Sequence, residues 1–237
     1  MNDFGTHNYI ANLSIDCVIF GYEEQELKVL IAKCIYGDNL WNLPGGHILR
    51  TESIEAAASR ILEQRTGLKD IYLEQFRVFG HENRILESKY RDILHAHLTN
   101  KYDESTANWI TDRFVCVGFY ALVDISKVNP QKGELDEKLE WRGIKDIPEM
   151  LHDHQEILNY ALEALRQNLD QKLIGFNLLP ETFTMKEVQE LYEAVYDREF
   201  PMNNFQRKML QLGILERLEK KFTGASNKAP YLYRFKK

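Results

Sequence analysis

Residues 45–68 read GGHILRTESIEAAASRILEQRTGL, and this stretch decides the fold of the first part of the chain. Its two glycines predict a tight turn, and the helical spacing of the apolar side chains that follow predicts a helix from Ser53 to Arg65. Thr51 or Ser53 can cap the start of this helix, and Gly67 can end it. The apolar positions on its predicted buried face are Ile54, Ala57, Ala58, Ile61 and Leu62.

The stretches around this turn and helix alternate between apolar and polar residues as strands do. Residues 10–22 and 26–36 predict a hairpin around the EEQE turn, and residues 41–49 continue as a strand and a tight turn. Helical amphipathicity replaces this alternation at 152–169, which predicts a helix that links two parts of the chain. Further strands are predicted within residues 71–80, 114–125 and 139–150.

Residues 81–111 are polar and irregular in pattern, and we interpret them as an insertion. They contain His95 and His97, which would point the same way if this segment were a strand. No third ligand accompanies the pair, so the sequence predicts no metal site here.

The charge of the chain is unevenly distributed. The 237 residues carry a net charge of -6, but residues 201–237 contain nine Lys or Arg and two Glu. The end of the chain therefore carries a net charge of +7, and the remainder carries a net charge of -13. A basic end on an acidic body indicates that this end meets a polyanion.

Composition limits the class of protein further. Apolar residues make up 44% of the sequence, which is enough for a packed core. No apolar run reaches the length of a membrane span and the start lacks a secretory signal, so we expect a cytoplasmic protein with no membrane partner. Cys17, Cys34 and Cys116 lie in strand-like apolar runs without metal-ligand spacing, and we expect reduced core thiols.

Five positions within residues 45–68 match the spacing of the Nudix box of nucleoside diphosphate-X hydrolases. The pattern is G-x5-E-x7-R-x6-G-L, it follows WNLPGG, and a chance loop and helix is the alternative. The resemblance implies a Nudix α/β/α sandwich with a mixed sheet over residues 1–150, within an α+β chain. The matching residues are Gly46, Glu52, Arg60, Gly67 and Leu68.

The Nudix box normally continues with glutamates that bind the magnesium ion needed for hydrolysis. Positions i, i+3 and i+4 share a helix face, so three carboxylates can converge there on one cation. In this chain that face carries Ile61, Gln64 and Arg65, and Glu63 points elsewhere around the helix. We therefore expect no metal, no cofactor and no enzymatic turnover. The alternative is a Nudix hydrolase of ADP-ribose or nucleoside diphosphate sugars.

Residues 173–237 have the order helix, turn, helix, strand, wing and strand, which predicts a winged helix-turn-helix domain. Thr184 can cap the first helix. Pro201 opens a second, recognition helix, which runs from Met202 to Leu212 and is stopped by Gly213. The side chains expected to point inward from this helix are Phe205, Met209 and Leu210.

The polar side of the predicted recognition helix has the side chains that read DNA. Amides can bind adenine edges, arginine can bind guanine, and lysines near the wing suit phosphates. Two such domains in a homodimer would read a palindromic operator. A winged helix used for protein contacts is the alternative. The predicted DNA-binding residues are Asn203, Asn204, Arg207, Lys208, Gln211, Lys220, Lys221 and Lys228.

Together the two parts resemble the Nudix-related transcriptional regulators, in which a disabled Nudix domain senses a small molecule. IGFNLLPETFT, LYEAVY and NNFQRKM are closest to the sugar-responsive branch, whose known type responds to arabinose, while another branch answers to ADP-ribose. The resemblance implies a sugar or sugar-derived effector. The amphipathic segment predicts the linking helix within residues 151–172. We expect the pocket near the C-terminal ends of the strands, beside the box helix and bordered by the insertion, with His47, Arg50, Glu52, Arg77 and Glu82 as polar lining.

Overall fold

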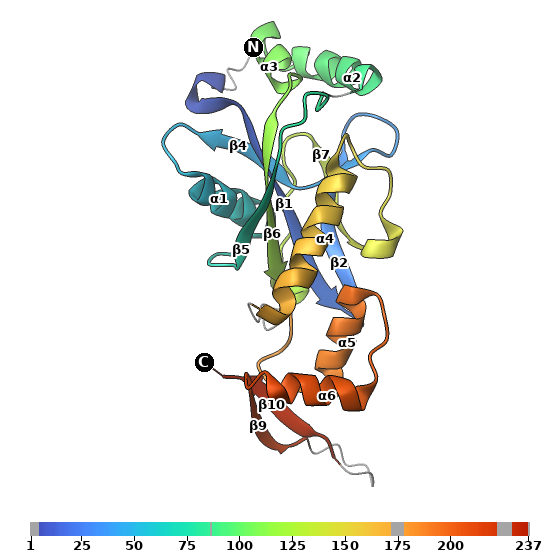
Figure 1. The fold of residues 1–237 in the computed structure, drawn as a ribbon. Helices are drawn as coiled ribbons and strands as arrows, with labels where there is room; N and C mark the ends of the chain where they lie inside the picture. The colour runs from blue at the N-terminus through green and yellow to red at the C-terminus, as the bar shows by residue number, and fades with distance from the viewer. Residues whose placement is uncertain (1–4, 86, 172–177, 222–228, 237) are drawn as a thin grey trace.

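A computed structural model describes residues 5–85, 87–171, 178–221 and 229–236. The first part is a seven-stranded mixed sheet, with the winged part at one end of the molecule (Figure 1). Short 3-10 turns occur at Thr6–Asn8, Ile125–Lys127 and Ile144–Asp146. The strands of the large sheet are β1 Tyr9–Glu23, β2 Glu26–Cys34, β3 Trp41–Asn42, β4 Gly45–Leu49, β5 Leu73–Phe79, β6 Val115–Val123 and β7 Asp136–Gly143.

Strand β1 lies at the centre of this sheet. It pairs in parallel with β6 and antiparallel with β2 and β4, which makes the sheet mixed. The hairpin between β1 and β2 turns at Glu24 and Gln25, whose φ values of 53° and 63° give the left-handed turn that matches strand twist. The predicted hairpin is therefore confirmed.

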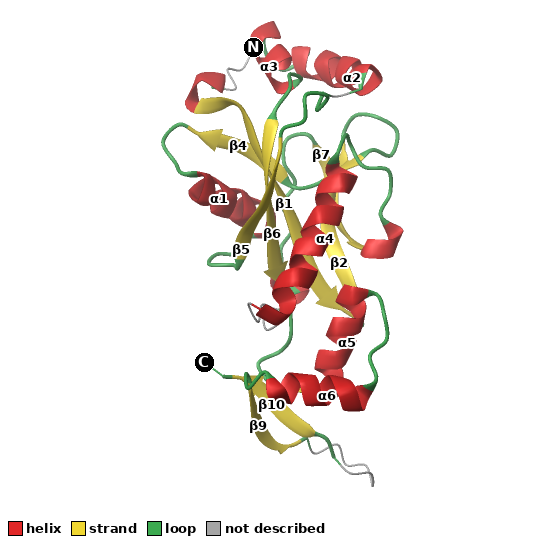
Figure 2. Ribbon diagram, in the orientation of Figure 1, coloured by secondary structure: helices red, strands yellow, loops and turns green. Residues whose placement is uncertain are grey.

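Two helices cover the two faces of the sheet, α1 at Ile54–Thr66 and α4 at His154–Gln171 (Figure 2). Side chains of β1 alternate between these faces: Cys17 packs with the α1 core, and Val18 packs with the α4 core. The predicted α/β/α sandwich is confirmed.

Local sequence signals define helix α1. The Ser53 hydroxyl accepts a hydrogen bond from the Ala56 N–H at 3.2 Å, and Gly67 ends the helix with a φ of 74°. Glycine adopts the left-handed conformation at little cost, so the predicted start and stop both hold. Cys17, Cys34 and Cys116 are buried thiols, as predicted.

The expectation of an irregular insertion is wrong, because residues 81–111 contain two helices. These are α2 at Ser88–Thr99 and α3 at Glu104–Ile110, and the signal for α2 was the buried pair Leu94 and Leu98, four residues apart. On a helix, side chains two residues apart are related by a rotation of about 200° around the axis and point to nearly opposite sides, so His95 and His97 do not converge. His95 lies 3.1 Å from the Asn108 side-chain oxygen, and His97 is exposed.

The last part has two helices and a three-stranded sheet of order β8-β10-β9. Thr184 and Glu187 form a capping box at the start of the first helix, and Gly213, with a φ of 69°, follows the second. The predicted inward position of Leu210 is wrong, since its side chain is 46% exposed. The elements are α5 Met185–Tyr196, α6 Met202–Gln211, β8 Phe183–Thr184, β9 Leu215–Lys220 and β10 Tyr231–Phe235.

The predicted linking helix is α4, which begins three residues later than the predicted span. It packs on the sheet, and its side chains Leu165 and Leu169 join the core that also contains Val188 and Leu191 of α5. Within the described segments, no helix combines the length and the apolar character needed to cross a membrane.

Candidate functional site

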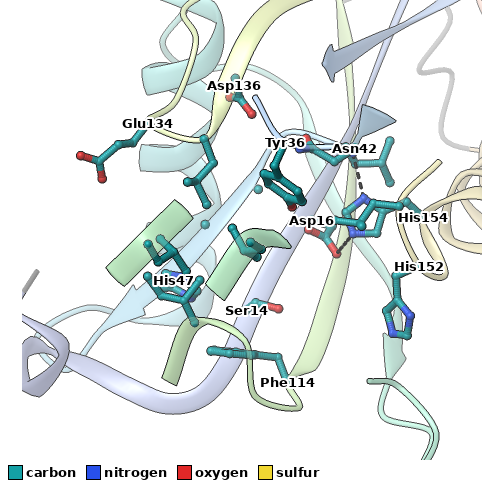
Figure 3. A pocket seen from close by; sticks show the side chains of 18 of the residues that line it. Ser14, Asp16, Tyr36, Asn42, His47, Phe114, Glu134, Asp136, His152 and His154 are labelled. Atoms are coloured by element: carbon teal, nitrogen blue, oxygen red, sulfur yellow. Dashed lines mark hydrogen bonds and ion pairs between the residues drawn. The ribbon is translucent and has the colours of Figure 1, made fainter. Parts of the chain in front are cut away.

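A pocket of about 330 Å³ opens between strand β4, helices α2 and α3, and the start of α4. Figure 3 shows Tyr36, Asp16 and His154 on one side of the cavity and His47 on the other. The pocket lies beside the box helix and is bordered by the insertion through Leu94 and Leu98, as expected. Its expected position at C-terminal strand ends holds only in part, because Tyr36 follows the C-terminal end of β2 whereas Phe114 and Asp136 lie at the N-terminal ends of β6 and β7. Its volume is at the low end for small-molecule sites.

The two glycines of the box let the chain pass close to strand β1. A Cβ atom on Gly45 would lie 2.5 Å from Asp16 Oδ1 and 2.6 Å from the Ile15 carbonyl oxygen. A Cβ atom on Gly46 would lie 3.1 Å from the Ile61 side chain. Any larger residue at position 45 would therefore displace Asp16 from the pocket.

An ion pair holds the box loop against α1. Glu52 Oε1 lies 2.6 Å from Arg60 Nη2 and also accepts a hydrogen bond from the Leu49 N–H at 2.8 Å. Arg60 Nη2 donates to the His47 carbonyl oxygen at 2.8 Å. The hydrogen bonds from Arg60 lower the pKa of Glu52, so this carboxylate stays charged and serves the loop.

The residues that replace the Nudix glutamates do not fit a magnesium ion. Ile61 is buried in the core, and the exposed Gln64 accepts a hydrogen bond from Arg60 at 3.2 Å. Arg65 Nη1 lies 2.5 Å from Asp136 Oδ2, and its Nη2 donates to the Gly45 carbonyl oxygen at 3.3 Å. A fixed guanidinium thus stands on the face where a hard cation would need oxygen ligands. No cluster of three metal-ligating side chains occurs in the described part of the chain.

A buried charge cluster forms the opposite wall of the pocket. Asp16 Oδ2 lies 3.3 Å from Arg84 Nη2 and 2.9 Å from the Cys116 thiol. Arg84 is only 9% exposed and also donates to Asp153 at 2.8 Å. A buried charge without a partner would be costly, and here Arg84 shares its charge between the two carboxylates of Asp16 and Asp153.

His154 completes this wall at the first residue of α4. Its Nδ1 accepts a hydrogen bond from the Leu43 N–H at 2.9 Å, which leaves the proton of the neutral ring on Nε2, 3.7 Å from Asp16. Burial lowers the pKa of His154. Sequence spacing did not indicate Asp16, Arg84 and His154, because they come from segments far apart in the chain.

His47 is the one predicted ligand residue that lines this pocket. Its ring lies 4.6 Å from the Trp109 ring and 5.2 Å from the Phe114 ring, measured between centroids. Burial lowers the pKa of His47 to about 4, so the ring is neutral at physiological pH.

The other four predicted ligand residues lie outside the pocket lining, and the structure does not bring them together. Arg50 is exposed and donates to the His7 carbonyl oxygen, Glu52 is committed to Arg60, and Glu82 is exposed. Arg77 stacks on Tyr160 of α4, with 3.8 Å between the guanidinium and the ring centroid. The pairing of β5 with β6 shifts register between Gln75 and Arg77, which the alternation of the sequence did not reveal.

Helix α6 presents a polar face to solvent while Phe205 and Met209 anchor its other side. Arg207 Nη2 donates to Asn204 Oδ1 at 3.2 Å. Around the wing, Lys220 lies near the Tyr231 ring, and Lys221 Nζ lies 3.2 Å from Glu187. Lys228 lies outside the described residues. The predicted DNA-binding residues found exposed are Asn203, Asn204, Arg207, Lys208, Gln211, Lys220 and Lys221.

Helix α4 connects the pocket to the last domain (Figure 1). It starts with His154 in the pocket wall, and near its other end Arg166 Nε donates to the Val195 carbonyl oxygen at 2.8 Å. The Tyr196 hydroxyl donates to the Arg166 carbonyl oxygen at 2.7 Å. With 18 residues and a rise of about 1.5 Å per residue, the helix spans roughly 27 Å.

These features define a pocket-bearing α/β/α domain joined to a winged helix with a basic, exposed second helix. Residues 12–163 match the NUDIX domain, and residues 175–235 match the NrtR DNA-binding winged helix domain. The chain therefore belongs to the Nudix family and carries the DNA-binding domain of the Nudix-related transcriptional regulators.

Known relatives share this arrangement over most of their length. The chain is 25% identical over 229 residues to the "ADPR responsive transcriptional repressor NtrR" of Acinetobacter baylyi, covering 94% of this chain and 81% of the relative. The Shewanella oneidensis NrtR crystallised with a 27mer DNA is 26% identical with a TM-score of 0.68, over 94% of this chain and 93% of that one. A MutT/nudix family protein from Enterococcus faecalis, 19% identical, shares the fold with a TM-score of 0.67, over 100% of this chain and 89% of that one.

Proposed function

We propose that this protein is an effector-gated transcriptional regulator whose Nudix domain binds a sugar or sugar-derived metabolite without hydrolysing it. The observation that carries the proposal is the Arg65–Asp136 ion pair, which fixes a protein cation on the face that should hold the catalytic metal. The pocket remains open beside it. A site that keeps its cavity and loses its metal ligands is suited to binding rather than turnover.

The charges of the pocket favour an uncharged, hydroxyl-rich effector. Its two arginines, Arg65 and Arg84, are each bound to carboxylates of the protein. A diphosphate would add negative charge beside Asp16 and Asp136 without a metal ion to screen it. Sugar hydroxyls can instead donate to these carboxylates, while Tyr36 and Phe114 offer apolar surface to the ring. A pentose such as arabinose suits this volume.

ADP-ribose is the second candidate effector. The Acinetobacter baylyi relative is described as ADPR responsive, and it is similar to this chain across both domains. ADP-ribose would need Arg65 or Arg84 to exchange a carboxylate partner for the diphosphate.

Helix α4 is the proposed route from effector to operator. His154 contacts Leu43 and Asp16 in the pocket, and Arg166 and Tyr196 tie the far end of the helix to α5. An effector that binds more tightly to one placement of α4 than to another shifts the protein toward that placement, and the winged helix moves with α4. The regulator acts as a homodimer on a palindromic operator, because one winged helix buries little DNA surface. A monomeric mass by light scattering, with and without operator, would contradict this assembly.

A thermal-shift screen of the full chain tests the effector class. The probes are pentoses, other sugars, sugar phosphates and ADP-ribose, and a ligand at 100 times its Kd stabilises by about 2.7 kcal/mol. His47→Ala should lose the shift, whereas Arg50→Ala, outside the pocket lining, should retain it. If no compound shifts the wild-type chain, the sensing proposal fails. Magnesium-dependent turnover of about 1 per second or more would establish the hydrolase alternative.

A further inference from the structure

Leu210 is an apolar side chain on the polar, outward face of the recognition helix. It is 46% exposed, while Phe205 and Met209 of the same helix are buried. A rotation of 100° per residue places Leu210 about 20° from Asn203 and about 60° from Arg207 around the helix axis. It therefore shares the face that is predicted to meet DNA.

An exposed leucine alone is ordinary on a protein surface, so its surroundings carry the argument. Leu210 lines one shallow depression of about 460 Å³ with the polar side chains of Asn203, Gln206, Arg207 and Gln211. The other exposed leucine nearby, Leu212, lies about 160° away around the axis, so the two do not form one apolar patch. The outward face of α6 thus has a single apolar group among amides and a guanidinium. Such a face is complementary to a partner surface that is mostly polar and has one apolar group.

We propose that Leu210 determines specificity by contacting the C5 methyl group of a thymine in the major groove of the operator. The thymine methyl is the apolar group that the base pairs present in that groove. This inference rests on operator binding through α6, and it adds an apolar contact to the methyl group that the polar residues of the helix do not provide.

The neighbours of Leu210 define which thymine it contacts. Arg207 presents a guanidinium that suits guanine, and Asn203, Gln206 and Gln211 present amides that suit adenine. Since Leu210 lies between Gln206 and Gln211 along the chain, the contacted thymine belongs to an A·T pair within reach of these amides, next to the base pair that Arg207 reads. Leu210→Ala should therefore relax one thymine position and leave the neighbouring preferences in place.

The test uses the full chain and an operator recovered by binding-site selection. Each thymine of the recovered site is replaced in turn by deoxyuridine, which removes only the methyl group. For the wild-type protein, one thymine position in each half-site should be sensitive. A single deoxyuridine at that position should weaken binding by about fourfold, the effect of removing one buried methyl-sized group. For Leu210→Ala, which is a surface change, the same replacement should have no effect.

Leu212→Ala is the matched control and should keep the wild-type response to deoxyuridine. The inference is overturned if every thymine tolerates deoxyuridine in the wild-type protein, or if Leu210→Ala keeps the full loss. It is also overturned if Leu210→Ala changes the oligomeric mass, because Leu210 would then contact a second copy. If the wild-type chain binds no DNA, operator binding itself fails, and this outcome is distinct from a bound but methyl-insensitive operator.

Discussion

The effector pocket and the outward face of α6 use charge in opposite ways. In the pocket, Arg84 is 9% exposed and bound to two carboxylates of the protein. On α6, Arg207 and Lys208 extend from an exposed face that Phe205 and Met209 hold in place from beneath. Changes in the pocket should therefore alter stability as well as binding, whereas changes on α6 should alter DNA recognition and leave stability nearly unchanged.

The largest expected effect is on the pocket side. Arg84→Met removes the cation from the buried cluster and leaves Asp16 and Asp153 without it, which should lower the free energy of unfolding by about 3–5 kcal/mol. Urea unfolding of the full chain measures this loss. Arg91→Met, at an exposed position of α2, is the control and should change stability by no more than about 0.5 kcal/mol. Equal unfolding curves for the two variants would contradict the role given to Arg84.

The next effect is the pH dependence of stability that His47 imposes. Its pKa is about 4 in the folded chain and 6.5 without burial, so between these values the unfolded chain binds the proton and the folded chain does not. Stability is complete above about pH 6.5 and falls as the pH drops toward 4, by at most about 3 kcal/mol from this residue. Buried His154 acts in the same direction.

His47→Gln should flatten this loss, as measured by urea unfolding at pH values between 4 and 7. His97→Gln changes an exposed histidine of α2 and should leave the pH dependence as it is in the wild-type chain. If both variants keep the wild-type dependence of unfolding free energy on pH, His47 is not a buried neutral ring in the folded chain.

Local signals predicted the box helix well, and long-range contacts explain what the sequence analysis missed. Ser53, Gly67 and the Glu52–Arg60 pair lie within 16 residues, so spacing alone indicated their geometry. Asp16 and Arg84 are 68 residues apart, and only the folded sheet brings them together. The sequence predicted where the pocket is, but only His47 of its expected lining.

The missed helix in the insertion and the wrong position of Leu210 have a different origin, because both concern local sequence patterns rather than long-range contacts. The helical spacing of Leu94 and Leu98 was present in the insertion, but the polar residues around it favoured an irregular segment. Leu210 was expected to point inward with Phe205 and Met209. Its outward position shows that an apolar residue type alone does not assign a side chain to the buried face of a helix.

A smaller effect is expected from a base contact on α6. Arg207→Ala should cost about 1–3 kcal/mol of specific operator affinity and relax the preference at one guanine, because a bidentate contact is lost. Binding-site selection with the variant identifies the position, and titration of the wild-type operator gives the affinity. Unfolding should match the wild-type chain, in contrast to Arg84→Met. A uniform loss of affinity for all sequences would assign Arg207 to a phosphate instead.

The smallest effect separates two adjacent lysines of the wing. The logarithm of the DNA association constant falls with the logarithm of salt concentration by about 0.9 for each phosphate that the protein neutralises. Lys220 is exposed beside the Tyr231 ring, whereas Lys221 is 3.2 Å from Glu187 of the capping box, which already supplies a negative partner. Lys220→Ala should therefore lower the slope by about 0.9, and Lys221→Ala should lower it by less.

Lys89→Ala, in the insertion at the opposite end of the molecule from the wing (Figure 1), should leave the slope unchanged. If Lys220→Ala and Lys89→Ala give the same slope, the wing does not lie along the phosphates and α6 alone positions the domain on DNA. If Lys221→Ala instead lowers the slope by as much as Lys220→Ala, operator binding draws Lys221 away from Glu187 and opens one ion pair at the start of α5.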